Sequence, residues 1–162
     1  MPERDENAEI ESARRYAGLL LKFRLRSVHE LDERLRRKNY SRPVIARVLS
    51  ALRDADVLND RRFARMWAAE RFRNAGRGSK AVRYELQRKG IDRALIDEAL
   101  AGFDEAAEMS AAQQAARKKT AQTADDSPAR RKAAVAAYLR RRGFSTTVIR
   151  KITGAGFFDE EP

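Results

Sequence analysis

The chain has 162 residues, no cysteine, and 35 Lys and Arg residues against 24 Asp and Glu residues, which gives a formal net charge of +11. The lack of cysteine excludes disulfides and thiolate metal sites, and no stretch approaches the roughly 20 apolar residues that a membrane span needs. A basic balance of this size suits a polyanionic partner or an acidic protein surface. The N-terminal sequence MPERDENAEIE is acidic where a secretory signal would be basic and then apolar, so we expect a cytoplasmic protein with no membrane partner.

The first predicted unit spans residues 9–57 and follows an N-terminal tail, residues 1–8. It opens with a helix over roughly 9–24, in which apolar residues recur at helical spacing. The sequence SVHE that follows is a capping box, in which Ser27 and Glu30 satisfy N–H groups at the start of a second helix. The unit therefore begins with two consecutive helices.

The second predicted unit spans residues 58–102 and opens with a helix over roughly 60–74. We expect Asp60 to be the N-cap of this helix, because Asp is a preferred residue at that position. Phe63 and Trp67 lie four residues apart on one helical face, a spacing that favours core packing over stacking on a nucleic-acid base.

The third predicted unit spans residues 103–157 and is followed by a C-terminal tail, residues 158–162. Its opening helix, roughly 104–120, is rich in alanine. Ser127 followed by Pro128 then begins the next helix, since proline is tolerated in the first helical turn. No segment shows sustained apolar and polar alternation with β-branched residues, so the sequence predicts an all-α protein.

One short motif occurs in all three units. It reads LRRKNYS at 35–41, LQRKGID at 86–92 and LRRRGFS at 139–145. A shift of about 51 residues superposes the first copy on the second, and a shift of about 53 superposes the second on the third. Apolar positions on both sides of the motif superpose as well. The chain is therefore predicted to contain three tandem three-helix repeats.

Each copy of the motif is predicted to form a corner between the second and third helices of its unit. The residue just past a helix end commonly adopts a left-handed backbone, which favours Gly and, next, Asn. The large apolar residue after it then packs back on the leucine five positions earlier, and Ser or Asp caps the next helix. The corner positions are Asn39, Gly90 and Gly143.

The sequence contains no convincing catalytic, metal or cofactor site. His29, the only histidine, lies in the capping-box turn with no cysteine to act beside it, so a surface role is expected. ELDE at 30–33 fits compensation of the helix dipole, and GRGS at 76–79 lacks the preceding strand and the following Lys-Ser/Thr pair of a phosphate-binding loop. We therefore expect a protein that is not an enzyme.

The basic residues are the better functional candidates. Residues 128–157 contain eight Lys and Arg residues and no Asp or Glu, whereas an ordinary solvated surface mixes both signs. Basic residues also recur at the corners, and if the repeats stack with a constant rotation they form a line of charge. The predicted partner-binding residues are Arg36, Arg37, Lys38, Arg88, Lys89, Arg131, Lys132, Arg140, Arg141, Arg142, Arg150 and Lys151.

Four segments together resemble the RecX family, whose members modulate the RecA recombinase. The segments are FRLRSVHELDERL, VLNDRRFARMWAAER, GSKAVRYELQRKGI and YLRRRGFSTTVIRKI, within about 24–152. The two middle segments are the most specific, through Asp60, Phe63 and the corner at Gly90. Asn39 departs from the pattern at a position where Gly is expected, and the alanine-rich opening of the third unit matches more loosely.

The resemblance implies an elongated, curved nine-helix array that lies in the groove of the RecA nucleoprotein filament. We expect a monomer, although the sequence itself leaves the oligomeric state open. The resemblance also implies a role in DNA repair and the SOS response, through inhibition of ATP hydrolysis, strand exchange and coprotease activity by RecA. The alternative is a stand-alone DNA-binding protein, since three-helix units with a basic last helix are similar to helix-turn-helix modules. Against it, TTVIRKITGAG offers few side chains placed to read base edges.

Overall fold

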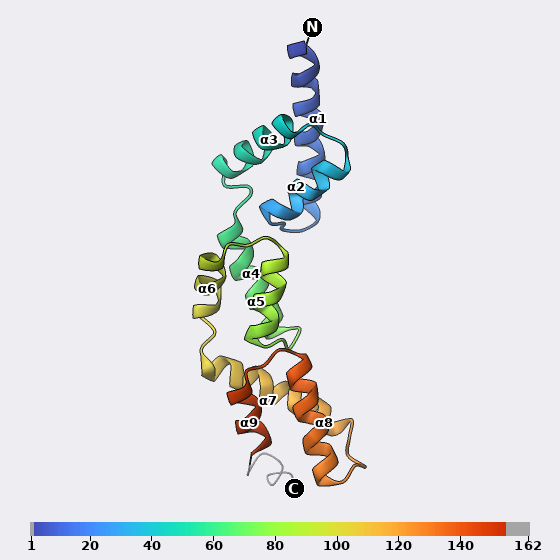
Figure 1. Ribbon diagram of the computed structural model, residues 1–162, viewed down its shortest axis with the longest axis vertical. Helices are drawn as coiled ribbons and strands as arrows, with labels where there is room; N and C mark the ends of the chain where they lie inside the picture. The colour runs from blue at the N-terminus through green and yellow to red at the C-terminus, as the bar shows by residue number, and fades with distance from the viewer. Residues whose placement is uncertain (1, 155–162) are drawn as a thin grey trace.

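The computed structural model describes residues 2–154, and every regular element in this range is an α-helix (Figure 1). The helices form an elongated array with α1 at one end and α8 and α9 at the other, so the predicted all-α fold of three tandem three-helix repeats is confirmed. The helices of this range are α1 (Pro2–Phe23), α2 (Val28–Arg37), α3 (Arg42–Asp54), α4 (Asp60–Arg73), α5 (Ser79–Arg88), α6 (Arg93–Ala101), α7 (Glu105–Ala121), α8 (Pro128–Arg141) and α9 (Thr146–Thr153).

Helix α1 begins at Pro2, so most of the predicted N-terminal tail is helical. Contacts with the third helix of the repeat hold its early turns. Glu6 Oε1 lies 3.1 Å from Arg47 Nη1, and Glu9 accepts hydrogen bonds from the backbone N–H of Ser41 at 2.6 Å and from its hydroxyl at 3.2 Å. Ser41 still begins α3, but its hydroxyl bonds to Glu9 and does not cap its own helix as predicted.

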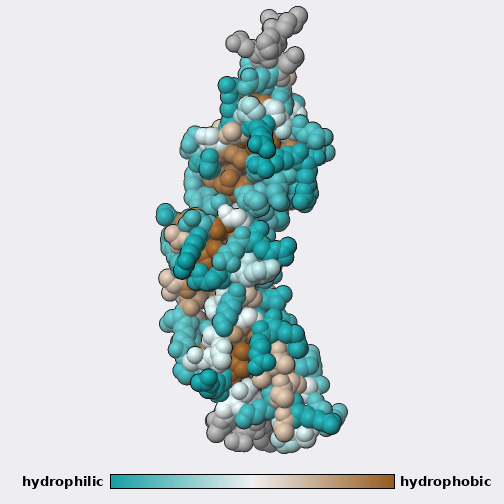
Figure 2. All heavy atoms as spheres, in the orientation of Figure 1, coloured by the Kyte–Doolittle hydropathy of each residue, from teal (hydrophilic) through white to brown (hydrophobic). Residues whose placement is uncertain are grey.

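Each repeat has its own apolar core. Figure 2 shows apolar side chains reaching the surface in three separate places along the array, with hydrophilic surface between them. The buried clusters are centred on Leu31, Leu35, Val44 and Val48 in the first repeat, on Phe63, Val82, Leu86 and Ile96 in the second, and on Val135, Leu139, Phe144 and Val148 in the third. The repeats are therefore joined mainly by contacts other than a shared core.

The predicted corners are confirmed. The backbone φ angle is +62° at Asn39, +71° at Gly90 and +80° at Gly143, all in the left-handed region. The N–H of the next residue donates to the leucine carbonyl five positions earlier, which is the hydrogen bond of a Schellman motif. These bonds are Tyr40 to Leu35 at 3.4 Å, Ile91 to Leu86 at 3.1 Å and Phe144 to Leu139 at 3.2 Å.

The middle helices of the three repeats, α2, α5 and α8, meet end to end (Figure 1). The Ser27 hydroxyl, before α2, donates to the carbonyl of Lys89 after α5 at 2.6 Å. The N–H groups of Gly78 and Lys80, at the start of α5, donate to the carbonyls of Arg142 at 2.9 Å and Gly143 at 3.1 Å. We call these three helices the column; each corner of the second and third repeats lies against the start of the preceding middle helix.

The close approach at these two junctions explains which corners carry glycine. A Cβ atom on Gly90 would lie 2.4 Å from Cβ of His29, and a Cβ atom on Gly143 would lie 2.4 Å from Cβ of Ala81. Asn39 is exposed, because the corner of the first repeat has no repeat ahead of it. A side chain is therefore tolerated there, and Asn is among the residues least penalised by the left-handed backbone.

Candidate partner-binding surface

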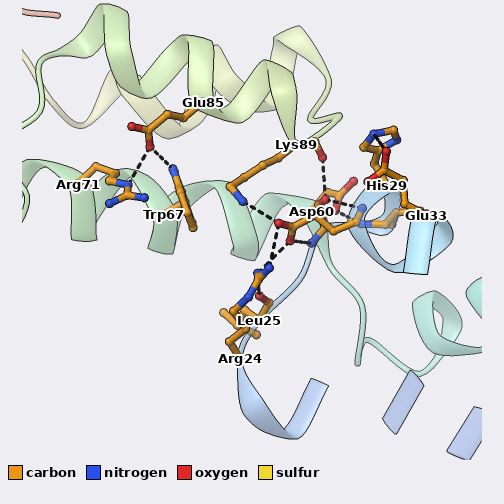
Figure 3. Close-up of polar contacts among 12 residues, drawn as sticks. Arg24, Leu25, His29, Glu33, Asp60, Trp67, Arg71, Glu85 and Lys89 are labelled. Atoms are coloured by element: carbon orange, nitrogen blue, oxygen red, sulfur yellow. Dashed lines mark hydrogen bonds and ion pairs between the residues drawn. The ribbon is translucent and has the colours of Figure 1, made fainter. Parts of the chain in front are cut away.

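Lys89, a predicted partner-binding residue, lies inside the junction between the first and second repeats (Figure 3). Its Nζ atom is 2.6 Å from Oε1 of Glu30 and 4.0 Å from the centroid of the Trp67 ring, and its side chain is only 17% exposed. Glu30 is also bonded by Arg24 at 3.0 Å. Lys89 thus joins the second repeat to the first, and the structure gives it an intramolecular role.

Arg131 and Arg142 also make intramolecular contacts. Arg142 donates to the carbonyl of Ala75 in the second repeat, and its guanidinium lies 4.9 Å from the centroid of the Tyr138 ring. Arg131 holds the link between α7 and α8 by donating to the carbonyls of Thr123, Ala124 and Asp126. The sequence could not separate these residues from surface cations, because the acceptors are backbone carbonyls.

Three more of the predicted cations form surface ion pairs. Each of these side chains is more than half exposed, and exposed pairs contribute only about 0–1 kcal/mol to stability. A partner can therefore replace the acidic residue at little cost. The pairs are Arg36 with Asp32, Arg37 with Glu33, and Lys151 with Glu105.

The remaining predicted cations are exposed and form no ion pair within residues 6–154. In the acid-free stretch from residue 128 to residue 154, only Lys151 has a carboxylate partner, so the positive charge of this segment is not neutralised by the described part of the chain. These cations are Lys38, which lies 5.4 Å from the Tyr16 ring centroid, and Arg88, Lys132, Arg140, Arg141 and Arg150.

One cation recurs at the same place in every repeat. Arg37, Arg88 and Arg141 are the last residues of α2, α5 and α8, and all three are exposed. Arginine at this position also compensates the negative end of the helix dipole. The column therefore carries one exposed guanidinium per repeat. The unpaired cations of α8 and α9 add further positive charge at the C-terminal end of the array.

Asp60 is not the N-cap of its helix, so that prediction is wrong. Asn59 is the N-cap, with its side-chain oxygen 2.9 Å from the N–H of Arg62. Asp60 Oδ1 instead accepts the N–H of Val28, the first residue of α2, at 2.8 Å. The acid satisfies an N–H of the preceding repeat, a contact that sequence reasoning about one helix cannot find.

Glu108 has the equivalent role at the next junction and was not recognised from the sequence. Its side chain is buried, and its Oε1 atom accepts the N–H of Ser79 at 3.1 Å, the hydroxyl of Ser79 at 2.9 Å and the N–H of Ser145 at 3.1 Å. One carboxylate therefore bonds the first residue of α5 and the N-cap of α9. The only signal in the sequence is an acid on an otherwise apolar helical face.

Trp67 packs within the protein, as its spacing from Phe63 predicts. The two rings stack with centroids 5.7 Å apart, and Phe63 is buried. The indole N–H of Trp67 donates to Glu85 at 2.9 Å, and the Arg71 guanidinium lies 4.3 Å from its ring centroid (Figure 3). With Lys89 against the ring as well, the partly buried Trp67 belongs to the polar network of the junction.

Two carboxyl groups at the first junction have displaced pKa values. Burial by itself would raise the pKa of Glu30, but hydrogen bonds from Arg24 and Lys89 outweigh it and lower the pKa from 4.5 to about 2. Burial raises the pKa of Asp60, and the hydrogen bond from the N–H of Val28 only partly offsets this. The junction thus contains one strongly stabilised carboxylate and one that is penalised when charged.

His29 is exposed, and its Nε2 atom lies 3.6 Å from Glu33, in agreement with the predicted surface position. Among the described residues, no group of three or more His, Cys, Asp and Glu side chains is placed to hold a metal ion. None of the helices described is both long and apolar enough to cross a bilayer.

Family models match most of the chain in three consecutive segments. The model described as RecX, first three-helix domain, matches residues 13–52; the second domain matches 59–100, and the third matches 106–153. Each segment falls within one of the three repeats of the structure.

Several curated relatives bear the name Regulatory protein RecX. The relative from Mycobacterium sp. (strain KMS) is 39% identical over 112 residues, which are 69% of this chain but 61% of that protein. The relative from Mycobacterium ulcerans is 38% identical over 148 residues, 91% of this chain and 86% of that protein. The chain thus spans about three fifths of the first relative and most of the second.

Two solved structures have the same fold. The crystal structure of RecX from Lactobacillus salivarius superposes with a TM-score of 0.81 at 23% identity, over 90% of this chain and 95% of that one. A second crystal structure of regulatory protein RecX gives a TM-score of 0.82 at 22% identity, over 89% of this chain and 72% of that one. These structures share the fold of the chain, and the three matching domain models and the mycobacterial relatives show that it belongs to the RecX family of regulatory proteins.

Proposed function

We propose that the protein is a non-catalytic negative regulator of RecA that binds as a monomer in the groove of the RecA–DNA filament and inhibits its ATPase, strand-exchange and coprotease activities. The observation that carries the proposal is the column, with an exposed arginine at the same position of every repeat. A repeating partner with acidic protein surface and DNA phosphates is complementary to a repeating line of cations.

The mechanism follows from the length of the array. An elongated protein seated along a helical filament contacts more than one protomer, and it thereby opposes the subunit motions that accompany ATP turnover. The free cations of α8 and α9 attract acidic filament surface or the phosphates of the bound strand, and this attraction weakens as salt screens the charges. We propose that the regulator acts in the cytoplasm and that its role is in DNA repair.

The test is the single-strand-dependent ATP hydrolysis of RecA. We expect the wild type to inhibit at well below one molecule per RecA subunit, and the variant Arg88→Gln, Arg140→Gln, Arg141→Gln to need roughly tenfold more protein, because three charges along the column are lost. The control carries Arg53→Gln, Arg61→Gln and Arg65→Gln, the same charge change on α3 and α4. No inhibition by the wild type at equimolar amounts ends the proposal.

The second candidate function is that of a stand-alone DNA-binding protein. The acid-free segment of α8 and α9 favours it, since non-specific affinity for phosphates follows from charge alone. The two functions differ in affinity for naked DNA as salt is raised: tight, sequence-selective binding without RecA supports the second candidate, whereas weak binding that falls steeply with salt and shows no sequence preference supports the first.

A further inference from the structure

A small pocket lies at the junction of the second and third repeats, away from the exposed ends of the column. Its volume is about 120 Å³, which is room for a group of several heavy atoms. The end of α4, the middle of α7 and the end of α8 surround it. Its polar lining side chains are Arg73, Asn74, Gln114, Lys118, Tyr138 and Arg142.

The pocket is positive, because its lining includes three cations and no acidic residue. The carboxyl ends of α4 and α8 each contribute about half a negative charge, so a charge of about +2 remains. The hollow at the other junction differs, since three glutamates and the cations Lys89, Arg71 and Arg88 line it together. Of nearby acids, Glu70 is bonded to the amide of Asn74 and does not line the pocket.

Arg142 is held ready to bind an oxyanion. One of its N–H groups donates to the carbonyl of Ala75, and its guanidinium carbon lies 4.9 Å from the centroid of the Tyr138 ring. A guanidinium has five N–H donors in a fixed fork that matches the oxygens of phosphate, so donors remain after this contact. Gly76, beside the guanidinium, has a φ of +55°, a left-handed backbone that favours glycine.

We infer that this pocket binds a phosphate group. Arg142 is the fixed hydrogen-bond donor, and the exposed side chains of Arg73 and Lys118 form ion pairs with the phosphate oxygens. A phosphate placed there contacts both repeats, so its binding stabilises their junction. The group can come from the backbone of a nucleic acid or from free phosphate, which share the same oxygens. The inference does not depend on RecA.

Thermal unfolding of the full chain tests binding with inorganic phosphate as the probe. At equal ionic strength, we expect phosphate to raise the Tm of the wild type by about 2–4 °C over chloride, because a ligand that binds only the folded state stabilises it. The variant Arg73→Gln, Lys118→Gln should lose this shift. The control Lys22→Gln, Arg117→Gln removes the same charge from exposed positions outside the pocket and should keep it.

Anisotropy of a labelled single-stranded oligonucleotide distinguishes the two sources. If a backbone phosphate occupies the pocket, the pocket variant lowers the slope of log affinity against log salt by about 0.7 more than the control variant, and phosphate competes with the oligonucleotide more strongly than chloride at equal ionic strength. If the pocket and control variants bind DNA equally but only the control retains the phosphate shift in Tm, the ligand is free phosphate. Equal phosphate shifts in all three proteins, or no shift in any, overturn the inference.

Discussion

Gly90 combines a left-handed backbone with a close contact to the neighbouring repeat. Its φ angle is +71°, and a side chain would meet His29 at 2.4 Å. We expect Gly90→Ala to lower the free energy of unfolding by about 2 kcal/mol or more, since the left-handed conformation alone costs about 1–2 kcal/mol and the overlap adds to it. Urea denaturation at neutral pH measures the change.

Asn39→Ala is the matched control for this variant. It places the same methyl group at an equivalent corner, φ +62°, where no repeat lies ahead. We expect a loss of about 1 kcal/mol, from the backbone alone. An equal loss at the two positions would show that the contact between Gly90 and His29 contributes nothing.

Because of Glu30, the free energy of unfolding depends on pH between 4.5 and about 2. Because its pKa is lowered from 4.5 to about 2 in the folded state, its contribution is present above pH 4.5 and is lost as the pH falls toward 2. Asp60 has the opposite sign, since its raised pKa makes ionisation a cost that acid removes. We expect the stability difference between the wild type and Glu30→Gln to shrink by about 1–3 kcal/mol over that range, as measured by denaturation at a series of pH values. A constant difference would contradict the assignment.

At the scale of elements, the junctions are polar and depend on single carboxylates. Glu108 is buried and accepts three hydrogen bonds, from both groups of Ser79 and from Ser145. We expect Glu108→Ala to lower the free energy of unfolding by about 3 kcal/mol, because it leaves three partly buried donors unpaired. Hydrogen exchange should quicken at the first turns of α5 and α9 and stay unchanged in α2, whose start is bonded to Asp60. Uniform quickening would contradict a local role.

The sequence predicted the helices and corners because their causes are local. The left-handed corner residue, the capping box at Ser27 and the packing of Phe63 on Trp67 depend on residues within a few positions of one another. The junctions were not predicted, because their partners lie far apart in the chain. In the sequence, Lys89 resembles a surface cation and Asp60 resembles an ordinary N-cap. Their partners, Glu30 and Val28, belong to the neighbouring repeat and are seen only in the structure.

For the whole molecule, three separate cores imply unequal stability along the array. The opening helix of the second repeat buries Phe63 and Phe72, whereas that of the third buries mainly Ala112, Ala115 and Ala116. Burying a Phe contributes about 1.5–3 kcal/mol, far more than burying an Ala. We therefore expect amides of α7 to α9 to exchange faster than those of α4 to α6 in hydrogen-exchange mass spectrometry, and equal protection of the two repeats would refute this.

The candidate surface could be predicted only in part. The exposed arginines that end α2, α5 and α8 were all recognised, since they belong to the repeated motif. Arg131 and Arg142 were included with them, although backbone carbonyls hold both side chains in place. Charge and periodicity identify where cations gather, but they do not say which of them an internal acceptor already occupies.

The exposed corner at Asn39 has a consequence for assembly. Each internal corner accepts the start of another middle helix because glycine leaves space, and at this end the corner residue, Asn39, carries a side chain. At the opposite end, α8 begins with Pro128, which lacks the N–H that Val28 and Ser79 donate to Asp60 and Glu108. Each terminal surface thus lacks one of the features that join the internal repeats: the glycine at the first corner and the N–H at the start of α8.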